Sequence, residues 1–336
     1  MVVASAPGKC ILFGEHAVVY GQPAVAVAID ARATVEIQKS NSGWKIDGMK
    51  FDKSRHPHID AVRKRLWSND GGPALEITVE SELFGAAGLG SSAAICSAFS
   101  AALLHARGTD PDALPHSGIA TTAHLAEAEA QDGRASPIDT STSSLGGAVF
   151  VSDRKESLAE WQYTRDLRID GERRTWEVHS IELPESVREA HIVIGFTGRP
   201  GSTAEMVSKV ANLLKSEPER MSDIERIGHV TRAGVTALNL GNLEAIGIAM
   251  NECHRLLQNL GVSDDDLDRM VEAALPSSLG AKMTGAGGGG CMIALTQEPR
   301  RTSEAIELAG GRTLVSPLGA SGVRIEESIE IPMWKR

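Results

Sequence analysis

The feature that most constrains the fold of this 336-residue chain is the glycine-rich segment GAAGLGSSAA, residues 85–94. It lies between the strand pattern ALEITVE and apolar residues at helical spacing from Ser92 onward, so we expect a strand, a tight loop and a helix in that order. Glycines let a backbone approach a ligand, and the first amides of a helix have no partner within the helix. The segment therefore predicts an anion site, with a tight turn capped by Ser91 or Ser92 as the alternative.

Two familiar nucleotide motifs do not describe this loop. It satisfies the pattern G-x-G-x-x-A, but no βαβ unit opens the chain, and no long buried parallel strand precedes the loop. A Walker A loop is also excluded, because no Gly-Lys-Ser/Thr closes the motif. The loop could bind the phosphates of a nucleotide, but through neither of these geometries.

Two further segments carry unusual glycines. In MTGAGGGGC, residues 283–291, each of four consecutive glycines costs roughly 0.5–1 kcal/mol relative to alanine in regular structure. Such a loop is expected to need close backbone approach, with a flexible hairpin connection as the alternative. In SAPGKCILFGEHAVVYG, residues 5–21, Lys9 follows Pro-Gly and a Gly-Glu-His triplet follows an apolar run. Lone lysines and histidines are usually surface or core residues, but this density of polar and glycine residues favours a site.

The rest of the chain predicts two α+β domains. Short strands fill the first 50 residues, with a hairpin turn at Asp47-Gly48, and the charged stretch 153–176 is expected to be a hairpin or a long loop. Helices are predicted at about 57–68, 92–106, 117–131, 203–214, 223–239, 242–260 and 263–275. The alternation is too irregular for a doubly wound parallel sheet. A shift in composition near 180–190 predicts domains at 1–185 and 186–336.

Charge and cysteine usage narrow the class of protein. The net charge is −10 with no long basic run, so neither a nucleic acid nor a membrane is an expected partner. Cys10, Cys96, Cys253 and Cys291 are far apart, which favours a reduced protein over a disulfide framework or structural zinc. The N-terminus shows no secretory pattern, and no run approaches the roughly 18 apolar residues of a membrane span. We expect a cytoplasmic protein.

Together the three glycine-bearing segments resemble the three motifs of the GHMP kinase superfamily, and within it those of the mevalonate kinase family. SAPGKCILFGEHAVVYG is similar to the first motif, GAAGLGSSAA to the second and KMTGAGGGGC to the third. ASPIDTSTSSLGG resembles the segment that carries the catalytic aspartate, and MNECHRLLQNLGVS resembles a helix of mevalonate kinases. The resemblance implies an N-terminal ribosomal-protein-S5-like domain and a C-terminal ferredoxin-like α/β-plait domain.

The same resemblance implies transfer of the γ-phosphoryl group of ATP to mevalonate, with Mg²⁺. It makes Asp139 the acceptor of the hydroxyl proton, with Lys9 beside it, and Ser92 and Glu127 the ligands of the metal. The nucleotide would be bound by Gly88, Leu89, Gly90, Ser91, Ser92, Ala93, Gly287 and Gly288. The substrate would be bound by Glu15, His16 and Thr203. To these we add Arg199, whose guanidinium could pair with the substrate carboxylate, a surface arginine being the alternative.

Two departures from the family pattern stand out. Phe84 occupies a position where the second motif usually has a proline. The metal-binding glutamate should lie eleven residues before Asp139, where this chain has an alanine flanked by Glu127 and Glu129. A one-residue insertion, at Asp132, would make Glu127 the ligand; on a helix the two glutamates point about 200° apart, so only one can face the site.

Two other functions stay open at this stage. One is another GHMP kinase, acting on phosphomevalonate or a sugar. The other is a GHMP homologue that binds nucleotide without catalysis, for which the shifted glutamate is the sole support. A homodimer is compatible with the sequence, which is otherwise silent on the oligomeric state.

Overall fold

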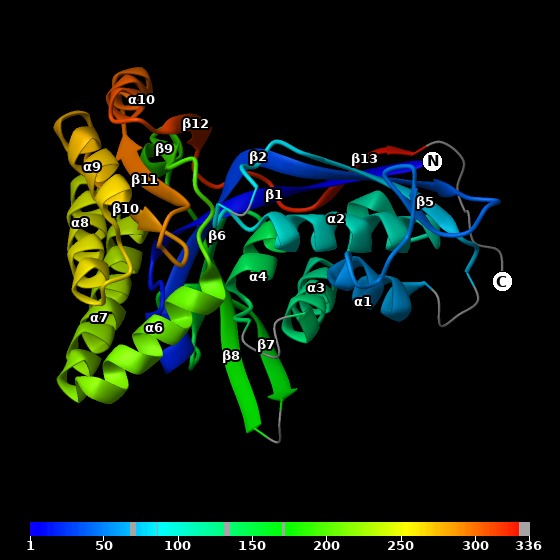
Figure 1. The fold of residues 1–336 in the computed structure, drawn as a ribbon, viewed down its shortest axis with the longest axis horizontal. Helices are drawn as coiled ribbons and strands as arrows, with labels where there is room; N and C mark the ends of the chain where they lie inside the picture. Colours follow the sequence, from blue (N-terminus) through cyan, green and yellow to red (C-terminus); the bar gives the residue numbers. More distant parts are fainter. Residues whose placement is uncertain (68–71, 86, 131–134, 170–171, 329–336) are drawn as a thin grey trace.

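The computed structural model describes residues 1–67, 72–85, 87–130, 135–169 and 172–328. A large sheet with helices on one face forms the first domain, and a smaller sheet with helices forms the second (Figure 1). Mixed, mostly antiparallel pairing confirms the α+β class and excludes a doubly wound parallel sheet. No helix in the described ranges combines the length and apolarity needed to cross a membrane.

The large sheet has the strand order β4-β3-β5-β2-β6-β8-β7, and β1 pairs with both β2 and β13. Its strands are β1 (Val2–Phe13), β2 (Ala24–Lys39), β3 (Lys45–Ile46), β4 (Met49–Lys50), β5 (Leu75–Ser81), β6 (Ala148–Ser152), β7 (Glu160–Ile169), β8 (Glu172–Ile181) and β13 (Arg324–Ser328). Residues of β1 are buried along almost its whole length, which fits a central strand.

Helices α1 (Pro57–Leu66), α2 (Ser91–Ala106), α3 (His116–Ala130) and α4 (Ile138–Leu145) lie against this sheet, below β1 and β2 in Figure 1. Two short 3₁₀ turns lie in the connections of this domain, η1 (Ala17–Tyr20) between β1 and β2 and η3 (Pro111–Ala113) between α2 and α3. Helix α2 is buried on most of its surface because alanines and other small side chains dominate its sequence. Its N-terminal end points toward the second domain.

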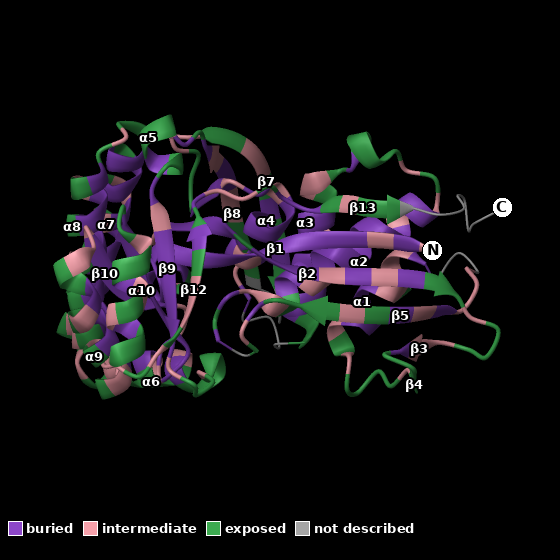
Figure 2. Cartoon of the chain, turned by 90° about the horizontal axis from the view of Figure 1, so that it is seen from above, coloured by how far each residue is buried: buried purple, intermediate pink, exposed green. Residues whose placement is uncertain are grey.

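The second sheet has the order β10-β11-β9-β12, with antiparallel pairs throughout. Its strands are β9 (His191–Phe196), β10 (Gly280–Thr284), β11 (Cys291–Thr296) and β12 (Arg312–Pro317). The helices around it are α5 (Glu185–Arg188), α6 (Thr203–Ser216), α7 (Met221–Asn239), α8 (Leu243–Asn259), α9 (Asp265–Ala274) and α10 (Pro299–Leu308), with 3₁₀ turns η4 (Pro218–Arg220) and η5 (Leu275–Ser277). Figure 2 shows most of β9 and β10 as buried, and β11 is buried throughout, whereas the edge strand β12 consists mostly of exposed and partly buried residues.

Most predicted elements are confirmed. Asp47 and Gly48 have φ angles of 49° and 75° between the paired residues Ile46 and Met49, as a two-residue hairpin requires. The charged stretch is largely a hairpin, β7–β8. The sequence did not predict α4, because its run of serines and threonines has low helix propensity and no apolar period.

The predicted domain boundary is wrong at the C-terminal end. The cut at 185/186 falls shortly before β9, but β13 lies in the large sheet, where Val2 pairs with Ser328 and Ser5 with Arg324. The second domain is therefore inserted between two parts of the first. Composition gave no sign of this, because strand pairing across the chain is set by packing and not by local sequence.

Candidate active site

A cavity of about 430 Å³ opens between the two domains, and residues of all three glycine-bearing segments line it. The first domain contributes Lys9, Ile11, Glu15, His16, Val18, Val19, 87–92, Glu127, Ala135, Ser136, Ile138 and Asp139. The second domain contributes Gly201, Thr203, Val207, 284–287, Gly289 and Gly290. The segments that the sequence marked as unusual therefore converge on one space.

The first glycine loop delivers the N-terminus of α2 to this cavity. Gly88 and Gly90 have φ angles of 79° and 74°, which side-chain-bearing residues rarely adopt. Gly90 is the N-cap, and no side chain caps the first turn, so the alternative of a serine N-cap is wrong. Uncapped amides at the start of a 16-residue helix remain available to an anion.

Lys9 joins this loop to the aspartate of α4. Its Nζ lies 3.1 Å from Asp139 Oδ2 and donates to the Gly88 carbonyl at 2.8 Å. The Lys9 side chain is buried, whereas Asp139, in the first turn of α4, is about one-third exposed toward the cavity. Gly90 is needed here, since a Cβ on it would lie 3.0 Å from Lys9 Cγ. The ammonium is thus fixed between the anion site and a carboxylate.

Glu127 is the second carboxylate of the cavity. It is buried on α3, and Ser92 Oγ donates to its Oε1 at 2.7 Å. Burial, and to a smaller extent the neighbouring Asp139, raise the pKa of Glu127 to about 7 against the opposing effects of Ser92 and Lys9. Glu129 instead forms an ion pair with Arg65 on the surface. Glu127 is therefore the glutamate that faces Ser92; Asp132, where we placed the insertion, lies outside the described residues.

The donor set around Glu127 fits a magnesium ion. Two carboxyl groups, those of Asp139 and Glu127, lie near the single ammonium of Lys9, and a bound cation would favour the ionised form of Glu127. Carboxylate and hydroxyl oxygens are the ligands Mg²⁺ prefers, and Glu127 and Ser92 offer both. In the described ranges, no three His, Cys, Asp or Glu side chains gather into a metal cluster.

Glu15 of the Gly-Glu-His triplet lines the cavity, but its carboxylate has a partner within the protein. The Glu15 carboxylate is buried and forms an ion pair with Lys282 of β10. His16, with a φ of 59°, does face the cavity, and its Nε2 donates to the Ala286 carbonyl at 2.8 Å. Burial lowers the pKa of His16, which favours the neutral ring. Both residues line the cavity, and each has a polar partner within the protein.

The glycine loop after β10 packs directly on the first loop. A Cβ on Gly285 would lie 3.3 Å from Gly88 Cα, and a Cβ on Gly287 would lie 2.0 Å from the Val262 carbonyl oxygen. Gly288 donates to that same carbonyl at 2.9 Å. The expectation of close backbone approach is confirmed. The predicted nucleotide contacts Gly288 and Ala93 are not among the described residues that line the cavity.

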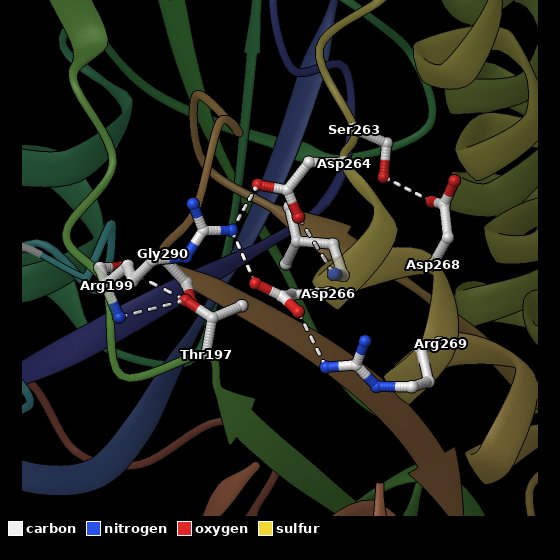
Figure 3. A network of polar contacts seen from close by, with 9 residues as sticks. Thr197, Arg199, Ser263, Asp264, Asp266, Asp268, Arg269 and Gly290 are labelled. Carbon is white, nitrogen blue, oxygen red and sulfur yellow. Dashed lines mark hydrogen bonds and ion pairs between the residues drawn. The ribbon is translucent and has the colours of Figure 1, made fainter. Parts of the chain in front are cut away.

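Arg199 is not among the described residues that line the cavity, and Figure 3 shows its guanidinium directed toward Asp264 and Asp266. Its guanidinium reaches Asp264 Oδ2 at 3.1 Å and Asp266 Oδ2 at 2.6 Å, and its side chain is 57% exposed. The predicted pairing with a substrate carboxylate is therefore not the pairing found, and the surface-arginine alternative describes the residue. Thr203, at the start of α6, does line the cavity.

Sequence reasoning missed two residues around the site, Thr284 and Lys282, and noted Phe84 without predicting its contact. Thr284 lines the cavity, and its Oγ1 accepts from the Ile11 amide at 2.9 Å, which joins β10 to β1. Lys282 is the hidden partner of Glu15. Both stand in KMTGAGGGGC, so the motif was the available signal, but their partners were not. Phe84, which replaces the family's proline, stacks on Phe196 with ring centroids 5.0 Å apart and so anchors the phosphate loop to the second domain.

Comparison with known proteins gives a consistent result. The family model described as GHMP kinases N terminal domain matches residues 58–147, and that described as GHMP kinases C terminal matches residues 235–309. The first segment contains α2, Glu127 and Asp139, and the second contains the end of α7 together with α8, α9, β10, β11 and α10.

Similarity to curated and solved proteins extends along the whole chain. Mevalonate kinase from Archaeoglobus fulgidus is 36% identical, over 97% of this chain and 100% of that protein. Mevalonate kinase from Pyrococcus furiosus is 33% identical, over 98% of this chain and 99% of that protein. The crystal structure of the Methanococcus jannaschii mevalonate kinase superposes with a TM-score of 0.71 at 26% identity, covering 97% of this chain and 98% of that one.

Proposed function

The chain belongs to the mevalonate kinase family of the GHMP kinases, and from that premise we propose that it transfers the γ-phosphoryl group of ATP to the primary hydroxyl of mevalonate. The observation that carries this proposal is the Lys9–Asp139 pair, held in one cavity with the uncapped start of α2. An anion site and a carboxylate beside it are what phosphoryl transfer to an alcohol requires.

In the proposed reaction the substrate hydroxyl oxygen forms a bond to the γ-phosphorus, the bond from that phosphorus to the bridging oxygen of ADP breaks, and Asp139 accepts the hydroxyl proton. The amides at the start of α2 hold the β- and γ-phosphates. The Lys9 ammonium, 3.1 Å from Asp139, stabilises negative charge on the transferring oxygens. The products are ADP and the phosphate ester.

Glu127 and Ser92 would hold Mg²⁺, which when bound neutralises charge across the phosphates. The Glu127→Gln variant should raise the Mg²⁺ concentration for half-maximal rate by about tenfold or more, because it removes the anionic ligand. Direct titration of Mg²⁺ by calorimetry in the presence of a non-hydrolysable ATP analogue provides a readout apart from activity. Glu129→Gln is the matched control; a larger shift in that variant would reverse the assignment.

His16 and Thr203 are the residues we propose to contact mevalonate, since both line the cavity. The apolar side chains of Ile11, Val18 and Val207 share this part of the wall and offer a surface for the methyl and methylene groups of the substrate. Arg199 and Glu15 are not part of this set, because each is held by an ion pair.

The test of function is an ADP-release assay with Mg-ATP and a panel of mevalonate, phosphomevalonate and galactose. We expect turnover with mevalonate at least a hundredfold above the other two. Preference for phosphomevalonate or galactose would reassign the substrate, and folded protein that binds ATP without turnover would support the inactive homologue.

We also propose a cytoplasmic location, as the sequence predicts. All four cysteines are buried free thiols, which suits a reducing compartment. The oligomeric state can be measured by sedimentation, and a homodimer stays a prediction from the sequence.

A further inference from the structure

Lys282 and Glu15 form an ion pair that solvent does not reach. Their side chains are 0% and 1% exposed, and Lys282 Nζ also donates to the Met283 carbonyl at 2.6 Å and approaches the Ile11 carbonyl at 3.5 Å. The Cys253 thiol of α8 lies 3.8 Å from Glu15 Oε2. Glu15 belongs to the first domain and Lys282 to the second, so the pair joins the domains beneath the cavity.

A buried ion pair between two domains carries a large desolvation cost. Removing two charges from water costs several kcal/mol per ion, and apolar side chains of similar size often give equal or greater stability. Stability alone therefore gives no reason to keep a lysine and a glutamate here. What the pair adds over an apolar contact is direction, since the ammonium fixes the carboxylate and two backbone carbonyls at defined positions.

The segment that Glu15 anchors is held in an uncommon backbone conformation. Gly14 has a φ of 101°, and a Cβ there would lie 2.4 Å from the Pro23 carbonyl. His16 has a φ of 59° although it is not a glycine, a conformation that costs on the order of 1–3 kcal/mol unless its surroundings impose it. The turn places the His16 ring against the Ala286 carbonyl on the cavity wall.

Lys282 lies on β10, just before the loop that contributes Ala286 to the His16–Ala286 contact. It is followed by Met283 and Thr284, and then by the glycine loop that carries Ala286. Its ammonium, bonded to the Met283 carbonyl, ties the last residues of β10 to the turn at Glu15. One buried charge thus sets the positions of both partners in the His16–Ala286 contact.

We propose that Lys282 is a positioning residue that, through Glu15, holds His16 and the 285–290 loop in register for the acceptor alcohol. The proposal rests on mevalonate phosphorylation as the reaction and adds a residue to its machinery. Lys282 touches neither ATP nor mevalonate, because it is fully buried and does not line the cavity.

Three variants test the proposal at a temperature where each is more than nine-tenths folded by circular dichroism. Lys282→Met leaves Glu15 buried without a partner, Glu15→Gln with Lys282→Met removes both charges, and Lys64→Met is the control. Lys64 pairs with the mostly buried Asp60 on α1, away from the cavity. We expect kcat/KM for mevalonate to fall about a hundredfold in Lys282→Met, the size of effect produced by a misplacement of roughly 1 Å. Affinity for an ATP analogue should change less than threefold.

The double variant separates positioning from stability. We expect it to regain most of the thermal stability lost in Lys282→Met, because no charge is left unpaired, while kcat/KM for mevalonate stays low. Recovery of both quantities would overturn the proposal, as would a folded Lys282→Met enzyme with wild-type kcat/KM.

Hydrogen exchange keeps the proposal testable whatever the substrate is. Amides 285–290 should exchange faster in Lys282→Met and in the double variant than in the wild type or Lys64→Met. Unchanged exchange would overturn the positioning role. If wild-type protein does not phosphorylate mevalonate but exchange changes as expected, the reaction assignment fails and the positioning role stands.

Discussion

The two walls of the cavity are built from different materials. Among the described lining residues, every charged side chain comes from the first domain, namely Lys9, Glu15, Glu127 and Asp139. The wall from the second domain consists of glycines, Ala286, two threonines and Val207. The wall from the first domain carries Asp139, the proposed proton acceptor, and the Lys9 ammonium. The wall from the second domain presents backbone groups and small side chains.

Two charged residues of the second domain lie close to the cavity without lining it. Lys282 pairs with Glu15 beneath the cavity, and Arg199 pairs with Asp264 and Asp266 on the surface beside it. Lys282 and Arg199 therefore stabilise the structure around the cavity, whereas Lys9 and Asp139 are placed to take part in a reaction within it. Substitutions in the first wall should therefore change the rate, and those in the second should change shape and stability.

The largest effect is expected for Asp139→Asn. Loss of the proton acceptor should lower kcat by roughly 10²–10⁴-fold, while affinity for ATP is largely kept. The measurement is ADP release at saturating mevalonate, with Asp166→Asn, in an exposed ion pair on the β7–β8 hairpin, as control. A kcat within tenfold of wild type would remove Asp139 from the reaction.

The second-largest effect is expected for Gly287→Ala, which changes the glycine loop of the second domain. The added Cβ would meet the Val262 carbonyl oxygen 2.0 Å away at a φ of 85°, so the loop must shift. We expect a loss of about 1–3 kcal/mol in the free energy of unfolding and a higher KM for ATP. Gly310→Ala, also at a positive φ but with no atom closer than 3.9 Å, isolates the steric part. Equal losses in the two variants would show that the clash is unimportant.

His254 makes the second wall sensitive to acid. It lies behind β10, where its Nδ1 accepts from the Met283 amide, and burial lowers its pKa from 6.5 to about 4. Between pH 6.5 and pH 4 this histidine is protonated in the unfolded chain but not in the native protein. Its contribution to the free energy of unfolding is therefore complete above pH 6.5 and is lost as the pH falls toward 4. At pH 5 this loss should be about 2 kcal/mol relative to pH 8.

Urea unfolding at pH 5 and pH 8 measures that difference. His254→Gln keeps an acceptor for the Met283 amide and does not titrate, so its stability should vary less between the two values. His229→Gln, on an exposed position of α7, should behave as wild type. Identical pH dependence in all three proteins would contradict the prediction.

Arg199→Ala should have the smallest effect. Exposed ion pairs contribute about 0–1 kcal/mol, so stability should change by no more than that and KM for mevalonate by less than about threefold. A rise in KM above about thirtyfold would show that Arg199 leaves Asp266 to bind the substrate. Arg226→Ala, which breaks a similar exposed pair with Glu252, is the control.

Site residues that stand in short motifs could be predicted from the sequence, whereas contacts between residues far apart in the chain could not. The glycine segments, Lys9, Ser92 and Asp139 stand in short motifs, whose roles follow from residue type and neighbours. Glu15 and Arg199 were assigned to the substrate because their partners lie 267 and 67 residues away, at Lys282 and Asp266, where no local pattern connects them. The choice between Glu127 and Glu129 needed the direction of each side chain from α3, which the spacing alone leaves ambiguous by one residue.

The fold divides in the same way. Helices with a clear apolar period, such as α7 and α8, were predicted within a few residues. Elements with short or polar sequences, such as β10 and α4, were not, because contacts with β1 and α2 stabilise them and not their own propensity. Phe84 shows that a departure from a family pattern can be filled by a contact that only the folded chain reveals.

The return of β13 to the edge of β1 has a consequence for biosynthesis. A ribosome releases β1 before the inserted domain, but the strand that pairs with its free edge is made only after that domain. Until then β1 presents unpaired amides and carbonyls, the kind of edge to which other chains can add. The nascent protein thus depends on a strand made after the inserted domain to pair with one made before it.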